Sequence, residues 1–116
     1  MAEYLPIYKP GQAITLAASA TITGGQLVEV TGSGTVGPAG AASVKVVGVA
    51  AFDAVNGDNV TIFAGGVQSV LASGAVTAGA VVQAGASGTV AAGTTAPIGI
   101  ALTTGTDVVV RVQMAR

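Results

Sequence analysis

Short stretches of alternating apolar and polar residues dominate this chain, and turn-forming residues separate them. In Val108–Met114 every second residue is Val or Met, whereas Arg111 and Gln113 fall on the opposite face. This period of two predicts strands, and the Gly residues that recur every few positions exclude long helices. The predicted strands are 13–17, 26–31, 44–51, 59–64, 67–72, 80–84, 88–91, 97–102 and 107–114.

A segment from the first half of the chain recurs in the second half. Residues 22–36, ITGGQLVEVTGSGTV, align at an offset of 54 with residues 76–90, VTAGAVVQAGASGTV. Two later matches follow in the same order, Val47–Ala50 with Ile98–Ala101 and Gly57–Ile62 with Gly105–Val110. Two copies are too few for a solenoid, but two related β units can close into a sandwich or a small barrel.

The fold class expected from these patterns is all-β, a small β-barrel or β-sandwich built from two related β units with an extended N-terminal arm. Residues 1–21 are expected to form the arm and the first strand. Residues 22–116 are expected to form a single β domain, with repeat copies at about 22–70 and 76–116. Pro6 and Pro10 favour an extended arm. Two interpretations of the arm stay open: a segment that forms an edge strand or folds over its own barrel, or an arm that reaches a neighbouring subunit.

The composition argues against catalysis and against most kinds of ligand. The 116 residues include no His, Cys or Trp, and the formal net charge is −1. Without His or Cys the usual metal, haem and nucleophile sites lack their side chains, and a Ser-His-Asp mechanism is excluded. We therefore expect no enzyme activity, no catalytic, cofactor-binding or metal residues, and no cofactor. The low charge and few aromatic residues also argue against nucleic acid, membrane and small-molecule partners.

No targeting or membrane-spanning segment is expected. The N-terminus, MAEYLPIYKPG, has Glu and Pro where a signal peptide would have a basic start and an apolar run. The stretch Asn59–Thr106 carries no charge, but Gly, Thr, Ser and Gln interrupt it too often for a membrane span. Small side chains bury little area each, so self-association or docking on a partner is one way to add stability.

Several short motifs are better explained by turns than by chemistry. Gly32–Gly37 fits G-x-G-x-x-G, but no helical pattern follows it, so a dinucleotide site is not expected. Asn59–Thr61 fits a glycosylation sequon on a predicted strand, which we attribute to chance. Asn56-Gly57 is the preferred pair of a type I′ turn, and it is predicted to join the strands on either side as a hairpin.

The charged side chains leave a few alternatives open. Asp53 and Asp58 flank one predicted turn, and solvated turn residues are favoured over a carboxylate pair for acid–base work or metal binding. Arg111 is expected on a solvated strand face, with an ion pair in an assembly as the alternative. A single exposed ion pair would contribute only about 0–1 kcal/mol.

The order of four segments resembles a known family. They are FAGGV at Phe63–Val67, AGAVV at Ala78–Val82, PIGIAL at Pro97–Leu102 and VVVRVQ at Val108–Gln113. In this order they resemble the capsid decoration, or cement, proteins of tailed bacteriophages, in particular the DUF2190-like group. The resemblance covers roughly residues 10–114 and rests on Gly and Val patterns.

The resemblance implies a compact β protein on the exterior of the virion capsid, made in the host cytoplasm. It implies binding to the major capsid protein, commonly as a homotrimer, and stabilisation of the shell by bridging capsid subunits. The candidate contact residues lie in the aromatic arm: Tyr4, Leu5, Pro6, Ile7, Tyr8 and Lys9. The alternatives are another virion structural module, such as a tail or fibre component, and a carbohydrate-binding β module.

Overall fold

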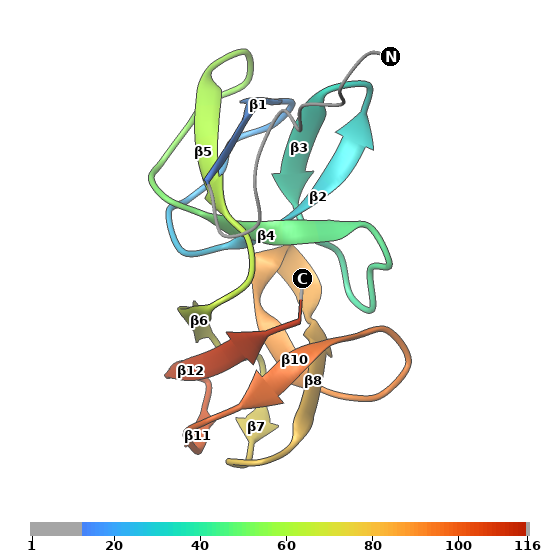
Figure 1. Cartoon of the computed structure of the whole chain (residues 1–116), viewed down its shortest axis with the longest axis vertical. Helices are drawn as coiled ribbons and strands as arrows, with labels where there is room; N and C mark the ends of the chain where they lie inside the picture. The colour runs from blue at the N-terminus through green and yellow to red at the C-terminus, as the bar shows by residue number, and fades with distance from the viewer. Residues whose placement is uncertain (1–12, 116) are drawn as a thin grey trace, which may run out of the picture.

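Two β units, stacked along the long axis of the molecule, make up the fold (Figure 1). The computed structural model describes residues 13–115. Unit 1 comprises residues 13–63 and unit 2 residues 67–115, and the chain crosses between them once, at Ala64–Gly66. The expected all-β class is confirmed, and one of the two units is a closed barrel.

Unit 1 is a five-stranded closed barrel with the order β1-β3-β2-β4-β5. Its strands are β1 (Ile14–Ala18), β2 (Leu27–Gly32), β3 (Thr35–Pro38), β4 (Val46–Ala50) and β5 (Asn59–Phe63). All neighbours are antiparallel except β1 and β3, which run parallel, and β5 pairs with β1 to close the barrel. The interior is filled by small apolar side chains: Ala18, Ile22, Val28, Val36, Ala50, Ala54, Val60 and Ile62.

Unit 2 has a five-stranded sheet with the order β6-β12-β10-β8-β9. Its elements are β6 (Val67–Leu71), β8 (Val81–Ala84), the 3-10 turn η1 (Ala86–Gly88), β9 (Val90–Ala92), β10 (Pro97–Ala101) and β12 (Val109–Met114). The short strands β7 (Ala75–Val76) and β11 (Gly105–Thr106) pair separately. A parallel bridge between Ala72 and Val90 joins the segment after β6 to β9.

The pairing registers make the two units copies of one another. The parallel pair Ala18–Val36 of unit 1 recurs, at an offset of 54, as the parallel bridge Ala72–Val90 of unit 2. The antiparallel register of β1 with β5 also recurs in that of β6 with β12, because Ile14 faces Ile62 and Gln68 faces Val112. This places β5 and β12 at an offset of 50, so the sequence match of Gly57–Ile62 with Gly105–Val110 is wrong by two residues. The correspondence therefore includes β1 and β6, although the sequence comparison began only at residue 22. The expected division of the chain at residue 21 stays a prediction.

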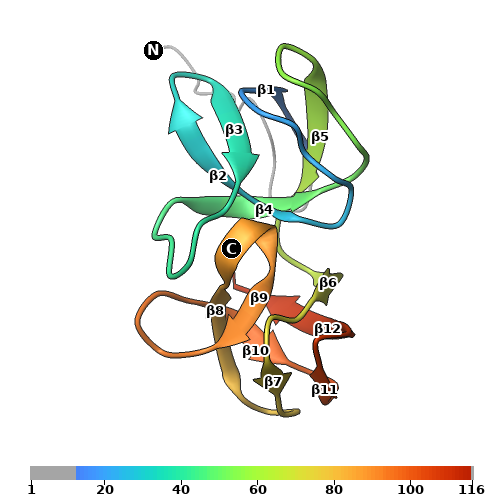
Figure 2. The same cartoon turned by 180° about the vertical axis from the view of Figure 1, so that it is seen from behind.

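One hydrophobic cluster joins the two units. The interior of unit 2 includes Val82, Val90 and Val110, and four residues on the outside of the unit 1 barrel belong to the same cluster. These four are Leu27, Ala39, Val46 and Val49. In Figure 2, β8 and β9 of unit 2 lie directly beneath β4. We call this contact between the units the unit junction.

Hydrogen bonds between residues of the described range 13–115 also cross the unit junction. The Ala42 N–H donates to the Ala84 carbonyl at 2.8 Å, and the Gly88 N–H donates to the Ala39 carbonyl at 2.8 Å. The Gln26 side-chain amide donates to the Ser87 carbonyl at 3.0 Å. Because backbone groups hold the junction as well as apolar side chains, it has a defined register.

The predicted strands agree with the observed ones except at three short strands, β3, β7 and β11. Gly and Pro occupy two of the four positions of β3, so its sequence carries a turn signal rather than a strand signal. The type I′ hairpin predicted at Asn56-Gly57 is wrong. Gly57 has a positive φ of 94°, but Asn56 has none, and a type I′ turn needs both. The turn instead lies inside the longer connection between β4 and β5.

Candidate functional site

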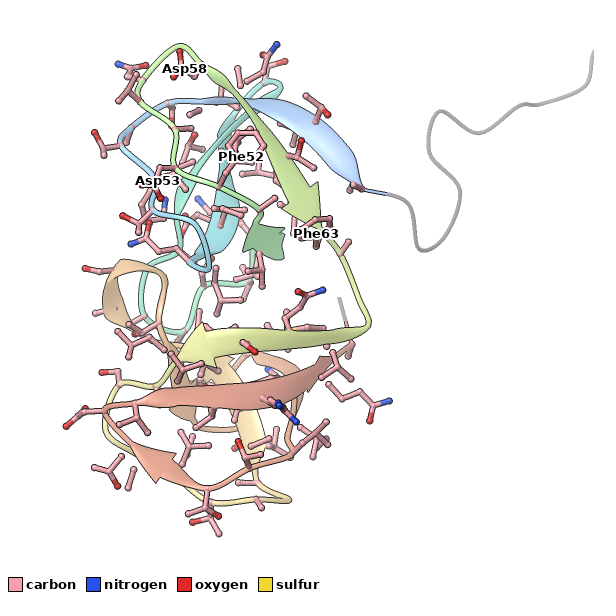
Figure 3. The ribbon with its side chains drawn as sticks, turned by 90° about the vertical axis from the view of Figure 1, so that its left-hand side faces the viewer. Phe52, Asp53, Asp58 and Phe63 are labelled. Atoms are coloured by element: carbon pink, nitrogen blue, oxygen red, sulfur yellow. The ribbon has the colours of Figure 1, made fainter. Side chains whose placement is uncertain are left out.

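Asp53 and Asp58 act as turn residues. The carboxylate of Asp53 accepts a hydrogen bond from the Gly24 N–H at 2.7 Å, and that of Asp58 accepts one from the Val55 N–H at 3.3 Å. In Figure 3, Asp58 lies at the end of unit 1 that faces away from unit 2, and Asp53 lies closer to the unit junction. Both are exposed, as expected for solvated turn residues. Across residues 13–115, no three His, Cys, Asp or Glu side chains gather closely enough to hold a metal ion.

The glycine motif Gly32–Gly37 forms the hairpin between β2 and β3. Gly32 pairs with Thr35, and Gly34, with a φ of 72°, occupies the turn. A dinucleotide site needs a helix that begins at this point, whereas a strand follows here. The motif is therefore structural. The sequon at Asn59 lies on β5, which pairs with strands on both sides.

The charged residues are dispersed over the surface. Glu29 accepts a hydrogen bond from the Gly40 N–H at 2.6 Å and lies 3.7 Å from the Lys45 ammonium. Arg111 is exposed on the outer face of β12, as expected, and its guanidinium has no ion-pair partner among residues 13–115. No charged cluster therefore forms in this part of the chain.

Exposed apolar side chains gather where unit 2 meets the turns of the unit junction. Leu71 on β6 and Val109 on β12 are cross-strand partners, and they are 48 % and 62 % exposed. Large aliphatic side chains are mostly buried in folded proteins. The exposed patch of Leu71 and Val109 is therefore a candidate surface for contact with another protein.

The same patch borders a groove between the two units. The groove has a volume of about 390 Å³, and we call it the inter-unit groove. Thr23–Gln26 of unit 1 form one wall, and Ser87–Thr89 of unit 2 form another. Ser69, Leu71 and Val109 complete it. Its lining consists of small polar groups and aliphatic side chains without a charge, which suits contact with a protein surface rather than catalysis.

Of the two candidate contact regions, the N-terminal arm and the inter-unit groove, only the groove lies within the described residues. The arm residues Tyr4–Lys9 lie outside the described residues, so their contact role stays a prediction. The inter-unit groove was missed from the sequence. Its one sequence signal is Val109, an apolar residue on the face of the last strand that otherwise carries Arg111 and Gln113. The other walls come from turns that only the fold brings together.

Residues 13–115 contain little helix. No helix in this range has the length and apolar character that crossing a membrane requires. Its helical segment, η1, has three residues.

Comparisons with known proteins identify a family and a solved structure of similar fold. The family model described as phage cement protein matches residues 8–114. None of the curated proteins matches the sequence. The solved structure described as the head fiber gp8.5 N base in bacteriophage phi29 has a TM-score of 0.73 at 18% sequence identity. That match covers 90% of this chain and 93% of the other, so the two share a fold over nearly their whole lengths.

Proposed function

This chain belongs to the phage cement protein family, and from that premise we propose that it binds the outer surface of a bacteriophage head. There it stabilises the shell by bridging subunits of the major capsid protein. The family is one of virion structural proteins, and its place is the capsid. The family match over residues 8–114 is the observation that carries the proposal, because it spans both β units.

The exposed surface of the described residues supports this role. A cement protein adds buried area at a joint between shell subunits, and apolar side chains supply most of the free energy when area is buried. The patch of Leu71 and Val109 beside the inter-unit groove offers such area without charges that must be desolvated. In the proposal this patch and groove contact the capsid.

Two further parts of the proposal extend beyond this patch. The arm residues Tyr4–Lys9 contact the capsid, since they form the most aromatic segment of the chain. The protein acts as a homotrimer, because several linked contacts raise the overall avidity through effective concentration. A net charge of −1 limits repulsion between copies that are held close together.

The proposal is tested by adding the purified full chain to expanded capsids that lack it, followed by cryo-electron microscopy. We expect additional density on the outside of the shell at positions between capsid subunits. Capsids with the chain bound should also resist heating better than capsids without it. Unchanged capsid density at saturating protein would contradict the proposal.

Substitution of the patch sharpens this test. Val109→Glu places a charge beside the inter-unit groove, and we expect it to weaken capsid binding at least tenfold, about 1.4 kcal/mol. The matched control is Val55→Glu, at a similarly exposed valine on the β4–β5 connection of unit 1. If both variants bind as the unchanged chain does, the patch is not the contact surface.

A second candidate function is the base of a head fibre. The observation in its favour is the similarity of fold to a structure described as a head fiber N base. The two candidates differ in what the capsid images show. A cement protein gives density that lies flat over the joints between subunits, whereas a fibre base carries density that projects away from the shell.

A further inference from the structure

The side of the unit 1 barrel that contacts unit 2 has an open counterpart on unit 2. Leu27 on β2 and Val49 on β4 are cross-strand partners, and unit 2 buries both of them. Their counterparts in the repeat are Val81 on β8 and Ile100 on β10, which are also cross-strand partners. Val81 is half-buried and Ile100 is 39 % exposed. The same apolar pair is thus covered in one unit and open in the other.

The other surface of the unit junction, the end of unit 2 that faces unit 1, has a more exposed counterpart in unit 1. Ala84 and Ile98 lie at the end of unit 2 that faces unit 1, and both are buried in the shared cluster. Their counterparts in unit 1 are Val30 and Val47. Val30 is 37 % exposed and Val47 is half-buried. Val47 packs against the barrel core of unit 1. Among residues 13–115, unit 1 therefore leaves Val30 open at the end that unit 2 has closed.

A turn of identical sequence strengthens the comparison. Ser87-Gly88 lies against unit 1, where the Gly88 N–H donates to Ala39 and the Ser87 carbonyl accepts from Gln26. Its counterpart in the repeat is Ser33-Gly34, and the two glycines have φ values of 74° and 72°. Gly88 is buried, whereas its counterpart Gly34 is exposed, and both serines are exposed. The docking turn thus has a second copy, Ser33-Gly34, that docks against no other unit among residues 13–115.

We propose that a second copy of this chain docks the open end of its unit 1 against the side of unit 2, and so repeats the unit junction between chains. The surface on unit 2 is formed by Val81, Pro97 and Ile100, and the surface on unit 1 by Val30 and the Ser33-Gly34 turn. This inference rests on the proposed function, for which it supplies the contact between copies. The occupant follows from the repeat, since each open surface corresponds to one side of a junction that the chain already makes.

The chemistry of the two surfaces fits this docking. The unit 2 surface carries no charged residue, and next to Val30 the charge of Lys45 is balanced by Glu29 at 3.7 Å. Different surfaces of the two copies meet, so the contact is heterologous. Such a contact closes into a ring or continues as an open array, depending on its rotation.

Cysteine pairs test the proposal cleanly because the chain contains no cysteine. Gln26 touches the Ser87-Gly88 turn at the unit junction, and the counterpart of Gln26 is Ala80. We therefore expect Ser33→Cys and Ala80→Cys to form a disulfide between chains when the two single variants are mixed and oxidised. The control mixture pairs Ser33→Cys with Thr106→Cys, which lies exposed on β11, a strand that pairs with β7 rather than with β8 or β10.

The expected result is at least about tenfold more linked dimer in the first mixture than in the control, because docking raises the effective concentration of the two thiols. Each single variant alone should give no such enrichment. The experiment is made with free protein and with protein bound to capsids. No enrichment in either setting overturns the proposal. Enrichment that requires removal of residues 1–12 also overturns it, since the arm of the same chain would then occupy the surface.

Charge substitutions give an independent readout by light scattering. Ile100→Glu and Val30→Glu should each prevent self-association, yet their mixture should form a one-to-one dimer, because each variant keeps one intact surface. A symmetric contact between identical surfaces would not restore dimer formation in the mixture. If the mixture forms no dimer, the heterologous arrangement is contradicted. Binding to capsids without any of these links would refute the docking and leave the proposed function standing. Disulfide links between chains that do not bind capsids would refute the proposed function and leave the docking standing.

Discussion

At the scale of single residues, two glycines mark places where neighbouring strands pass too close together for any side chain. Gly48 in β4 and Gly99 in β10 occupy equivalent positions of the two units. A β-carbon at Gly48 would collide with the carbonyl oxygen of Phe63, and one at Gly99 with that of Gln113. Both obstacles are backbone atoms of the neighbouring strand, which a rotamer change cannot move. The repeat has therefore kept glycine at this position for a steric reason.

We predict that Gly99→Ala lowers the free energy of unfolding by about 2 kcal/mol, since a well-packed strand pair must shift to admit the methyl group. Urea denaturation followed by circular dichroism measures this. The matched control is Gly40→Ala, where the nearest atom to the new carbon is a Glu29 carboxylate oxygen at 3.6 Å, an ordinary contact. Equal losses in the two variants would show that the strand approach is not the cause.

The alternation of the sequence predicted correctly which residues face inward in the last strand, because Val110 and Val112 are buried and Arg111 is exposed. It could not predict that Leu27 and Val49 are buried as well. They lie on the outside of their barrel, and only the docking of unit 2 covers them. A pattern of period two reports the face of a strand, but it does not report what lies against that face.

At the scale of elements, the strength of the alternating pattern decides which strands could be predicted from the sequence. The strands with a clear Val alternation were predicted within one or two residues, as in β5 and β12. The strand β3 was missed because its residues, TVGP, have few strand formers, and pairing with both β1 and β2 holds it in place. Tertiary contacts decide such short strands more than local preference does.

The N-terminal arm supplies a prediction at this scale. We expect deletion of Met1–Lys9 to leave a folded chain, because the barrel strands of unit 1 begin only at Ile14. The deletion should weaken capsid binding, since it removes both tyrosines and the apolar residues between them. Capsid co-sedimentation measures the binding, and circular dichroism checks the fold. Unchanged binding, or an unfolded chain, would exclude the arm as a contact element.

At the scale of the whole molecule, the shared cluster makes the two units depend on each other. The interior of unit 2 is completed by Leu27, Ala39, Val46 and Val49 from unit 1, so unit 2 lacks part of its own core. Small side chains dominate both interiors, and each contributes little buried area. We infer that the junction contributes much of the stability of unit 2.

We therefore predict that Leu27→Ala costs about 2–5 kcal/mol of the free energy of unfolding, although it lies on the outside of its own barrel. The loss should also lower hydrogen-exchange protection in unit 2, for example in β8. The repeat offers an internal control at the counterpart position, Val81→Ala, where the half-buried side chain should cost less than about 1 kcal/mol. Protection lost only in unit 1 would show that the units are stable independently.

The closure of the unit 1 barrel affects whether closely packed copies of the chain aggregate through their sheet edges. An open sheet presents a row of unpaired N–H and C=O groups at its edge, and such an edge invites aggregation with other chains. In unit 1 the parallel pairing of β1 with β3 and the antiparallel pairing of β1 with β5 leave no such edge. At unit 1, chains concentrated on one surface would therefore meet through side chains and turns, and this barrel would not seed the cross-β stacking that leads to amyloid.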